Sequence, residues 1–291
     1  MGSAQPSQTD LQGSLTANIA NATAPLFHDA FYKFVVVQDP DALVTQLRDL
    51  GCGLLGSVLV AHEGINGMLA GPEQALDNFQ TALRMDPRFQ GQFASMQFKR
   101  SPCTTRPFNK LKIHRKPEIV PLGIDGIDAT CRTGINVSPA DWQKLIYEDD
   151  VVVIDNRNSF EHRLGRFKNS INPQVANFRD FPNYVKEHIE CWKMERKRVA
   201  MYCTGGIRCE KTSAWMLDLG LPVYQLEGGI LNYFIEMPDA ASDWEGECFV
   251  FDNRIALDTR LMETGTTLED VYDSARDGEW RMRRARLLQA G

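Results

Sequence analysis

The sequence predicts an α/β protein built from two units, and three observations support that prediction. The chain has 291 residues, which is about two domains of the usual 100–200 residues. Its first part alternates short apolar runs with amphipathic helices in the order β-α-β-β-α-β. Its second part alternates continuous apolar runs with helices, which is typical of a doubly wound parallel sheet.

The first unit is expected over residues 25–118, and its element order is that of a ferredoxin-like α+β domain. Strands are predicted by β-branched and aromatic runs, and helix starts by Asp39-Pro40 and Pro72. The expected strands are 31–37, two strands within 56–71 and 93–100; the expected helices are 39–51 and 72–86. The segment LKIHRKPEIV is expected to be extended and to lead out of this domain. Residues 1–24 are polar and aperiodic, which predicts a disordered tail.

The second unit is expected over residues 127–246, followed by a C-terminal extension at 247–291. Apolar runs without polar alternation predict strands that are buried on both faces of a sheet. Ser138 and Pro139 have the residue types of an N-cap and first helical position. The expected strands are 150–157, 197–203 and 221–229, and the expected helices are 137–146, 210–220 and 230–238.

Composition and charge exclude several protein classes. No apolar run approaches the roughly 20 residues that cross a bilayer, and the first residues lack the features of a secretion signal, so we expect a cytoplasmic protein without membrane association. Seven cysteines without paired spacing predict neither a disulfide framework nor a metal site. Most of them are expected to be small buried hydrophobes: Cys52, Cys131, Cys191 and Cys248.

Cys203 is predicted to be a reactive nucleophile. It ends a predicted parallel strand directly before a helix, and reactive groups of open α/β sheets gather at such strand ends. The loop that follows can direct backbone N–H groups and a helix N-terminus at the sulfur, which favours the thiolate. The expected active-site loop consists of Thr204, Gly205, Gly206, Ile207 and Arg208.

The length of this loop indicates which class of cysteine enzyme it resembles. Four residues separate Cys203 from Arg208, one fewer than in the loops with which tyrosine phosphatases wrap a phosphate. The shorter loop resembles that of rhodaneses, which holds a thiolate or persulfide. The segment DNRNSFE resembles an early rhodanese segment, with three residues in matching places that we expect to support the loop: Asp155, Arg157 and Glu161. Cys209 either resolves an oxidised Cys203 or packs inertly in the helix.

Basic residues between 99 and 116 form a stripe without one Asp or Glu, although the net charge of the chain is −6. Such a stripe can contact phosphates, and the alternative is a solvated charged face. The candidate RNA-binding residues are Lys99, Arg100, Arg106, Lys110, Lys112, Arg115 and Lys116. A second basic cluster, WRMRRAR at 280–286, is either a further contact or an exposed helix.

Taken together, CTGGIRCEK, DNRNSFEHRLGRFKNSINP and WEGECFVFDNR resemble the bacterial tRNA uridine hydroxylases that carry a rhodanese domain, and the likeness runs from about residue 31 to 257. The resemblance implies hydroxylation of carbon 5 of the wobble uridine in the tRNA anticodon loop, with molecular oxygen as co-substrate. The sequence has no flavin, haem or iron motif, so we expect no bound cofactor. It also implies that Cys203 is the essential cysteine. The chain departs from the family in NSINP and in having no cysteine after Cys248.

Two other functions fit parts of the pattern. The Cys203 loop alone fits a sulfurtransferase that carries a persulfide, and the fold alone fits a non-catalytic module that binds RNA or protein. The first domain and the basic stripe favour the RNA-modifying enzyme, and the intact Cys203 and Arg208 disfavour the module. We expect no obligate protein partner.

Overall fold

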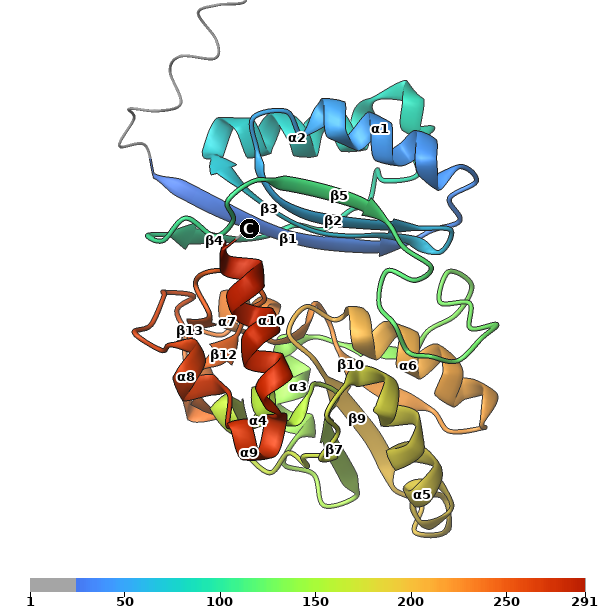
Figure 1. Ribbon diagram of the computed structural model, residues 1–291. Helices are drawn as coiled ribbons and strands as arrows, with labels where there is room; N and C mark the ends of the chain where they lie inside the picture. Colours follow the sequence, from blue (N-terminus) through green and yellow to red (C-terminus); the bar gives the residue numbers. More distant parts are fainter. Residues whose placement is uncertain (1–24, 291) are drawn as a thin grey trace, which may run out of the picture.

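The computed structural model describes residues 25–290, in which two α/β domains lie against each other and a C-terminal extension packs along both (Figure 1). The predicted tail at 1–24 lies outside the described residues. No helix within residues 25–290 is both long and apolar enough to span a membrane.

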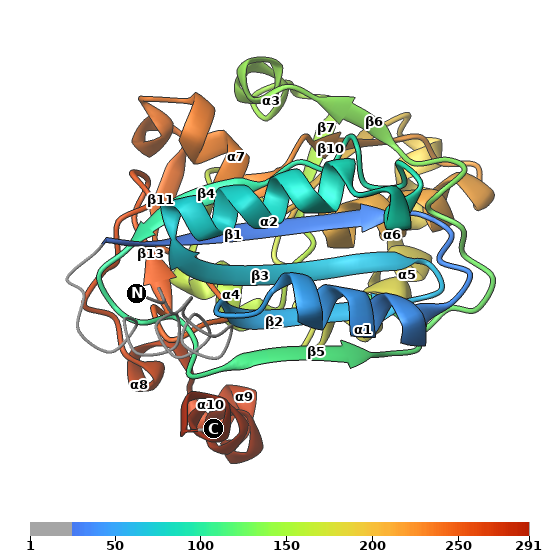
Figure 2. The ribbon, with the colours of Figure 1, turned by 90° about the horizontal axis from the view of Figure 1, so that it is seen from above.

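A five-stranded sheet forms the first domain, in the order β4-β1-β3-β2-β5. Its strands are β1 (Leu26–Phe34), β2 (Leu55–Ala61), β3 (Gly64–Pro72), β4 (Lys99–Cys103) and β5 (Leu111–Arg115). The helices α1 (Pro40–Leu50) and α2 (Glu73–Met85) cover one face (Figure 2). Asp39 caps α1 by accepting from the amides of Asp41 and Ala42, at 3.1 and 3.0 Å. The ferredoxin-like prediction is confirmed.

Two predictions for this domain differ from the structure. Residues 93–95 are a turn and residues 96–98 have no regular structure, so the strand begins only at Lys99. Phe93 and Met96 are both buried, and this spacing of three does not match the alternating faces of a strand. The segment after Lys110 does not simply leave the domain. It forms β5, which pairs in parallel with β2 and buries Ile113 beneath α1.

The second domain holds a parallel sheet in the order β6-β10-β9-β7. Its strands are β6 (Ile135–Val137), β7 (Val151–Asp155), β9 (Arg198–Tyr202) and β10 (Val223–Leu226). The helices α5 (Phe181–Met194) and α6 (Ile207–Asp218) bury apolar residues on one face, and α3 (Pro139–Leu145) and α7 (Gly229–Glu236) on the other. The doubly wound prediction is confirmed. Strand β6, α5 and the short helix α4 (Ser159–Leu164) were not predicted.

Short strands β8 (Gly165–Phe167) and β12 (Cys248–Phe249) lie beside α4. Strand β8 pairs with β11 (Trp244–Gly246), and β12 pairs with β13 (Ala256–Leu257). Within residues 25–290, 3₁₀ turns occur at Pro87–Phe89, Phe178–Asp180 and Ala240–Ser242. The chain continues through α8 (Leu268–Val271), α9 (Ser274–Asp277) and α10 (Glu279–Ala290).

The uncovered face of the first sheet lies on the second domain (Figure 1), and charged side chains of the two domains pair across this junction. The Lys211 ammonium on α6 donates to both carboxylate oxygens of Glu63, at 2.9 and 2.8 Å, and to Glu118 at 2.5 Å. Lys211 itself is only 2% exposed. A buried ammonium is stable only with such partners, so the two domains supply each other's charge balance.

Candidate active site

Cys203 lies directly after β9, where the chain turns into α6. The Gly206 amide donates to the Cys203 sulfur at 3.2 Å. Gly206 has φ of 100°, a left-handed conformation that side chains rarely adopt, and it forms the N-cap of α6. The loop is held from the other side by α7, since the Ile230 amide donates to the Cys203 carbonyl at 3.0 Å and Leu231 to Thr204 at 3.1 Å.

The thiol environment favours the charged form. Burial alone would raise the pKa of Cys203 from 9.0, but donation from the Cys209 thiol, the charge of Arg208 and the amides of Cys209 and Arg208 outweigh it and lower this pKa to about 5. Burial and the neighbouring Cys203 sulfur raise the pKa of Cys209, so the pair carries its charge on Cys203. The site therefore offers a thiolate at neutral pH.

Arg208 is held by Glu161 through two hydrogen bonds of 2.8 and 2.7 Å. Both side chains are buried, and Glu161 also accepts from the Asn158 amide at the start of α4. Arg208 additionally donates to the Thr204 hydroxyl at 3.4 Å. Glu161 thus fixes the Arg208 guanidinium beside the thiolate. Without this partner the arginine side chain would be flexible and hydrated, and it would stabilise the thiolate less.

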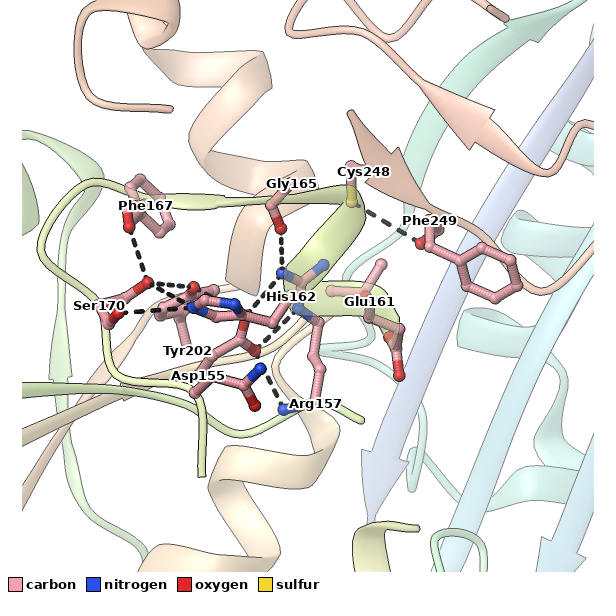
Figure 3. A network of polar contacts seen from close by, with 12 residues as sticks. Asp155, Arg157, Glu161, His162, Gly165, Phe167, Ser170, Tyr202, Cys248 and Phe249 are labelled. Carbon is pink, nitrogen blue, oxygen red and sulfur yellow. Dashed lines mark hydrogen bonds and ion pairs between the residues drawn. The ribbon is translucent and has the colours of Figure 1, made fainter. Parts of the chain in front are cut away.

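Asp155 and Arg157 form a separate buried network (Figure 3). Arg157 donates to the Asp155 carboxylate at 2.9 and 2.6 Å and to the Gly165 carbonyl at 2.6 Å. The Tyr202 hydroxyl donates to the same carboxylate at 2.8 Å. These contacts brace the ends of β7 and β9, whereas Glu161 acts on the loop itself.

The prediction that four other cysteines are buried is only partly correct. Cys248 is buried as expected, but Cys52, Cys131 and Cys191 are exposed. In α5 the buried positions include Val185, Ile189 and Trp192, and this helical spacing leaves Cys191 on the solvent side. No cluster of three or more metal-binding side chains of His, Cys, Asp or Glu occurs within residues 25–290.

The first domain contributes two side chains to the loop that the sequence did not identify as parts of the active site. The Lys99 ammonium donates to the Gly205 carbonyl at 3.0 Å, and the Tyr32 hydroxyl donates to Glu210 in the first turn of α6 at 2.8 Å. Strand pairing places Lys99 and Tyr32 on neighbouring strands, β4 and β1. These contacts span 106 and 178 residues, so local sequence patterns carry no signal for them.

The predicted basic stripe is not one surface. Strands β4 and β5 are opposite edges of the sheet, which separates Lys99 and Arg100 from the basic residues of 110–116. Lys99 is buried against the Cys203 loop, and Arg100 pairs with Asp29 at 2.8 Å and Asp77 at 2.8 Å. Arg106 donates to carbonyls of its own turn. The side chains near the β5 edge are Lys110, Lys112, Arg115 and Lys116, of which Arg115 pairs with Asp41 at 2.5 Å.

The second basic cluster comes close to this edge. The Asn109 side chain donates to the Gln289 carbonyl at 2.7 Å, which brings the end of α10 to the start of β5 (Figure 2). Arg283 and Arg284 are exposed on α10, and Arg286 is exposed and pairs with Glu269 at 2.6 Å. Two clusters that are far apart in sequence thus adjoin in the fold, which the sequence did not predict.

One aromatic side chain near the loop is exposed. Phe251 follows β12 and is 51% exposed, with the Arg208 guanidinium 5.9 Å from its ring centre. A large exposed apolar side chain beside a reactive group is a common contact for a flat ligand.

Comparison with known proteins agrees with this architecture. Residues 28–119 match the family described as UPF0176 acylphosphatase like domain, and residues 138–236 match the rhodanese-like domain. The tRNA uridine(34) hydroxylase of Legionella pneumophila (strain Corby) is 41% identical over 253 residues, which cover 85% of this chain and 96% of that protein. The chain belongs to the tRNA uridine(34) hydroxylase family.

A second relative supports the same membership. The tRNA uridine(34) hydroxylase of Synechococcus elongatus is 47% identical over 234 residues, which cover 79% of this chain and 85% of that protein. The resemblance described from the sequence is therefore confirmed, and the chain is a member of a family of hydroxylating enzymes.

Proposed function

We propose that this chain hydroxylates carbon 5 of the wobble uridine in tRNA anticodon loops, with Cys203 as the nucleophile and molecular oxygen as co-substrate. The supporting observation is the buried Cys203 beside the N-terminus of α6, in a chain that belongs to a family named for hydroxylation of uridine 34. The reaction takes place in the cytoplasm, where anticodon loops are accessible.

The chemistry begins with the electron-poor carbon 6 of uracil. The Cys203 thiolate adds there, and the electron pair of the double bond moves toward carbon 5 as an enolate. One atom of O₂ then becomes the hydroxyl on carbon 5 and the other becomes water, which requires two electrons and two protons from a thiol reductant. Loss of the Cys203 sulfur and of the proton on carbon 5 restores the double bond. Covalent addition divides one difficult substitution into easier steps.

The substrate base has to be unstacked from the anticodon loop, where unstacking costs little. Phe251 offers a face for such a base, since its half-exposed ring lies beside Arg208. The edge of β5 and the exposed arginines of α10 form the basic surface for the tRNA backbone. Lys99 and Arg100 do not belong to this surface, because one is buried and the other is held by carboxylates.

The decisive experiment treats unmodified tRNA with the purified chain and excess dithiothreitol, a dithiol reductant, under isotopically heavy O₂ and analyses its nucleosides by mass spectrometry. We expect one heavy oxygen atom in the uridine at position 34, and none with Cys203→Ser. A wild-type chain that alkylates normally at Cys203 but adds no oxygen would overturn the proposal. Transfer of sulfur from thiosulfate to an acceptor under the same conditions would instead identify a sulfurtransferase.

A further inference from the structure

We infer that the first domain completes the active site through Lys99 and Tyr32, which are positioning residues for the thiolate. The inference rests on the proposed role of Cys203 and deepens it. Lys99 then positions the Cys203 loop and does not contact RNA phosphate.

The geometry connects Lys99 to the sulfur through a single peptide group. The carbonyl of Gly205 and the N–H of Gly206 belong to the same planar peptide, and in a trans peptide they point in opposite directions. Lys99 binds that carbonyl at 3.0 Å, and the N–H on the other side donates to the Cys203 sulfur at 3.2 Å. The ammonium therefore fixes the orientation of this peptide, and by polarising the carbonyl it strengthens the N–H as a donor.

Lys99 is enclosed at this position. It is 9% exposed, its ammonium lies 5.3 Å from the centre of the Tyr32 ring, and a Cβ added to Gly228 would come within 3.1 Å of its Cε. Burial lowers the pKa of the Lys99 ammonium to about 8, while the charges of Cys203 and Glu210 oppose that shift. The ammonium is therefore mostly charged at neutral pH, and its hydrogen bond goes to the loop.

Tyr32 holds the adjacent part of the loop. Its hydroxyl donates to Glu210, and a Cβ added to Gly206 would come within 2.7 Å of that hydroxyl oxygen. Gly206 is thus required both by its left-handed backbone and by the close approach of Tyr32. Glu210 lies in the first turn of α6, directly after Arg208 and Cys209, whose amides favour the Cys203 thiolate, so this hydrogen bond holds that turn in place.

The test measures the rate at which iodoacetamide alkylates Cys203 as a function of pH, by mass spectrometry of the peptide that contains it. The alkylation rate at high pH measures how accessible the sulfur is, and the midpoint of the pH profile measures the pKa of Cys203. Lys99→Met removes the charge but keeps the stem, and we expect the midpoint to rise by about one pH unit, a tenfold loss of thiolate below the midpoint. Lys33→Met, on β1 with its ammonium on Ser95, is the matched control and should leave the midpoint unchanged.

Tyr32→Phe provides a second test that preserves the packing of the ring. Loss of the hydrogen bond releases the first turn of α6, whose Arg208 and Cys209 amides favour the thiolate, so the midpoint should rise here too, by less than in Lys99→Met. Wild-type midpoints in both folded variants would overturn the inference, as would a midpoint shift in Lys33→Met as large as that in Lys99→Met. Because alkylation needs neither tRNA nor oxygen, the result is independent of whether the chain hydroxylates uridine.

Discussion

Cys203 derives its predicted reactivity from groups of two kinds. The Gly206 amide and the first turn of α6 are neighbours in sequence, whereas Glu161 and Lys99 reach the loop from other elements. The strand end, the paired glycines and the arginine made the nucleophile predictable, because all of them are local. Tyr32 and Lys99 were not predictable as active-site groups, because their contacts depend on how two domains pack.

Replacing Cys203 with serine should abolish hydroxylation without changing the fold. A serine hydroxyl stays protonated where the cysteine ionises, and the two side chains have nearly the same shape. Product would be measured by nucleoside mass spectrometry and folding by thermal denaturation. Cys191→Ser, at an exposed position on α5, is the control and should retain full activity. Hydroxylation at the wild-type rate by a folded Cys203→Ser chain would remove this residue from the mechanism.

Arg208 and Glu161 should shift the ionisation of Cys203 in the same direction. Arg208→Ala removes a favourable charge, so the alkylation midpoint should rise from about 5 by at least roughly one pH unit. Glu161→Gln removes the carboxylate that holds the guanidinium beside the sulfur, so the midpoint should rise as well, by less than in Arg208→Ala. A wild-type midpoint in Glu161→Gln would contradict the role of Glu161 in holding Arg208.

The same lowered pKa makes the stability of the fold depend on pH. A cysteine that ionises more readily when folded contributes its full stability above pH 9.0, and that contribution disappears as the pH falls toward 5. Wild type should therefore lose more stability than Cys203→Ser between pH 8 and pH 6 in urea denaturation. Parallel pH dependences for the two proteins would show that Cys203 does not ionise early.

At the scale of the elements, the strands made of continuous apolar runs were predicted well, whereas the edge strands β5 and β6 were not. Strand β9 and helix α6 follow from their own residues, because each is a continuous run of mostly buried residues. Strand β5 has only one buried residue, Ile113, so its own pattern does not predict a strand. It is a strand because it pairs with β2 in the folded sheet. The order of the strands also separates 99–100 from 110–116, so a stretch that is continuous in sequence serves two different parts of the molecule.

The β5 edge should therefore affect tRNA binding without affecting the thiol. Changing Lys110, Lys112 and Lys116 to Glu removes up to three phosphate contacts, and each lost contact lowers the slope of log affinity against log salt by roughly 0.7–0.9. Affinity would be measured at several salt concentrations, together with the alkylation midpoint of Cys203. Lys144→Glu, on α3 of the second domain, should leave both unchanged. An unaltered salt slope in the triple variant would assign the tRNA contact to another surface.

The whole molecule depends on charge pairs that neither domain satisfies alone. Lys211 lies on α6 and finds Glu63 on the first domain and Glu118 on the connecting segment. The two domains could be recognised from the sequence, because each has its own periodic pattern. Their mutual orientation could not, because nothing in the pattern around Lys211 indicates that its partner is Glu63.

Replacing Lys211 with methionine should destabilise the protein by about 2–3 kcal/mol. Loss of one partner of a buried pair costs roughly 3–5 kcal/mol, and here the two carboxylates retain some contact with water, which reduces the cost. The measurement is the thermal unfolding midpoint by calorimetry. Lys193→Met, which removes an exposed pair on α5, should cost well under 1 kcal/mol. Equal midpoints for the two variants would show that the junction does not depend on this ammonium.

The distance in sequence between the two halves of the active site has a consequence for biosynthesis. Lys99 leaves the ribosome 106 residues before Gly205, and Glu63 leaves it 148 residues before Lys211. At roughly 5–20 residues per second, translation takes on the order of 5–30 s to deliver those partners. During that interval the nascent first domain presents Tyr32, Lys99 and Glu63 to water. Since Leu231 of α7 also holds the Cys203 loop, the thiolate site is assembled only after residue 231 of the 291 has been made.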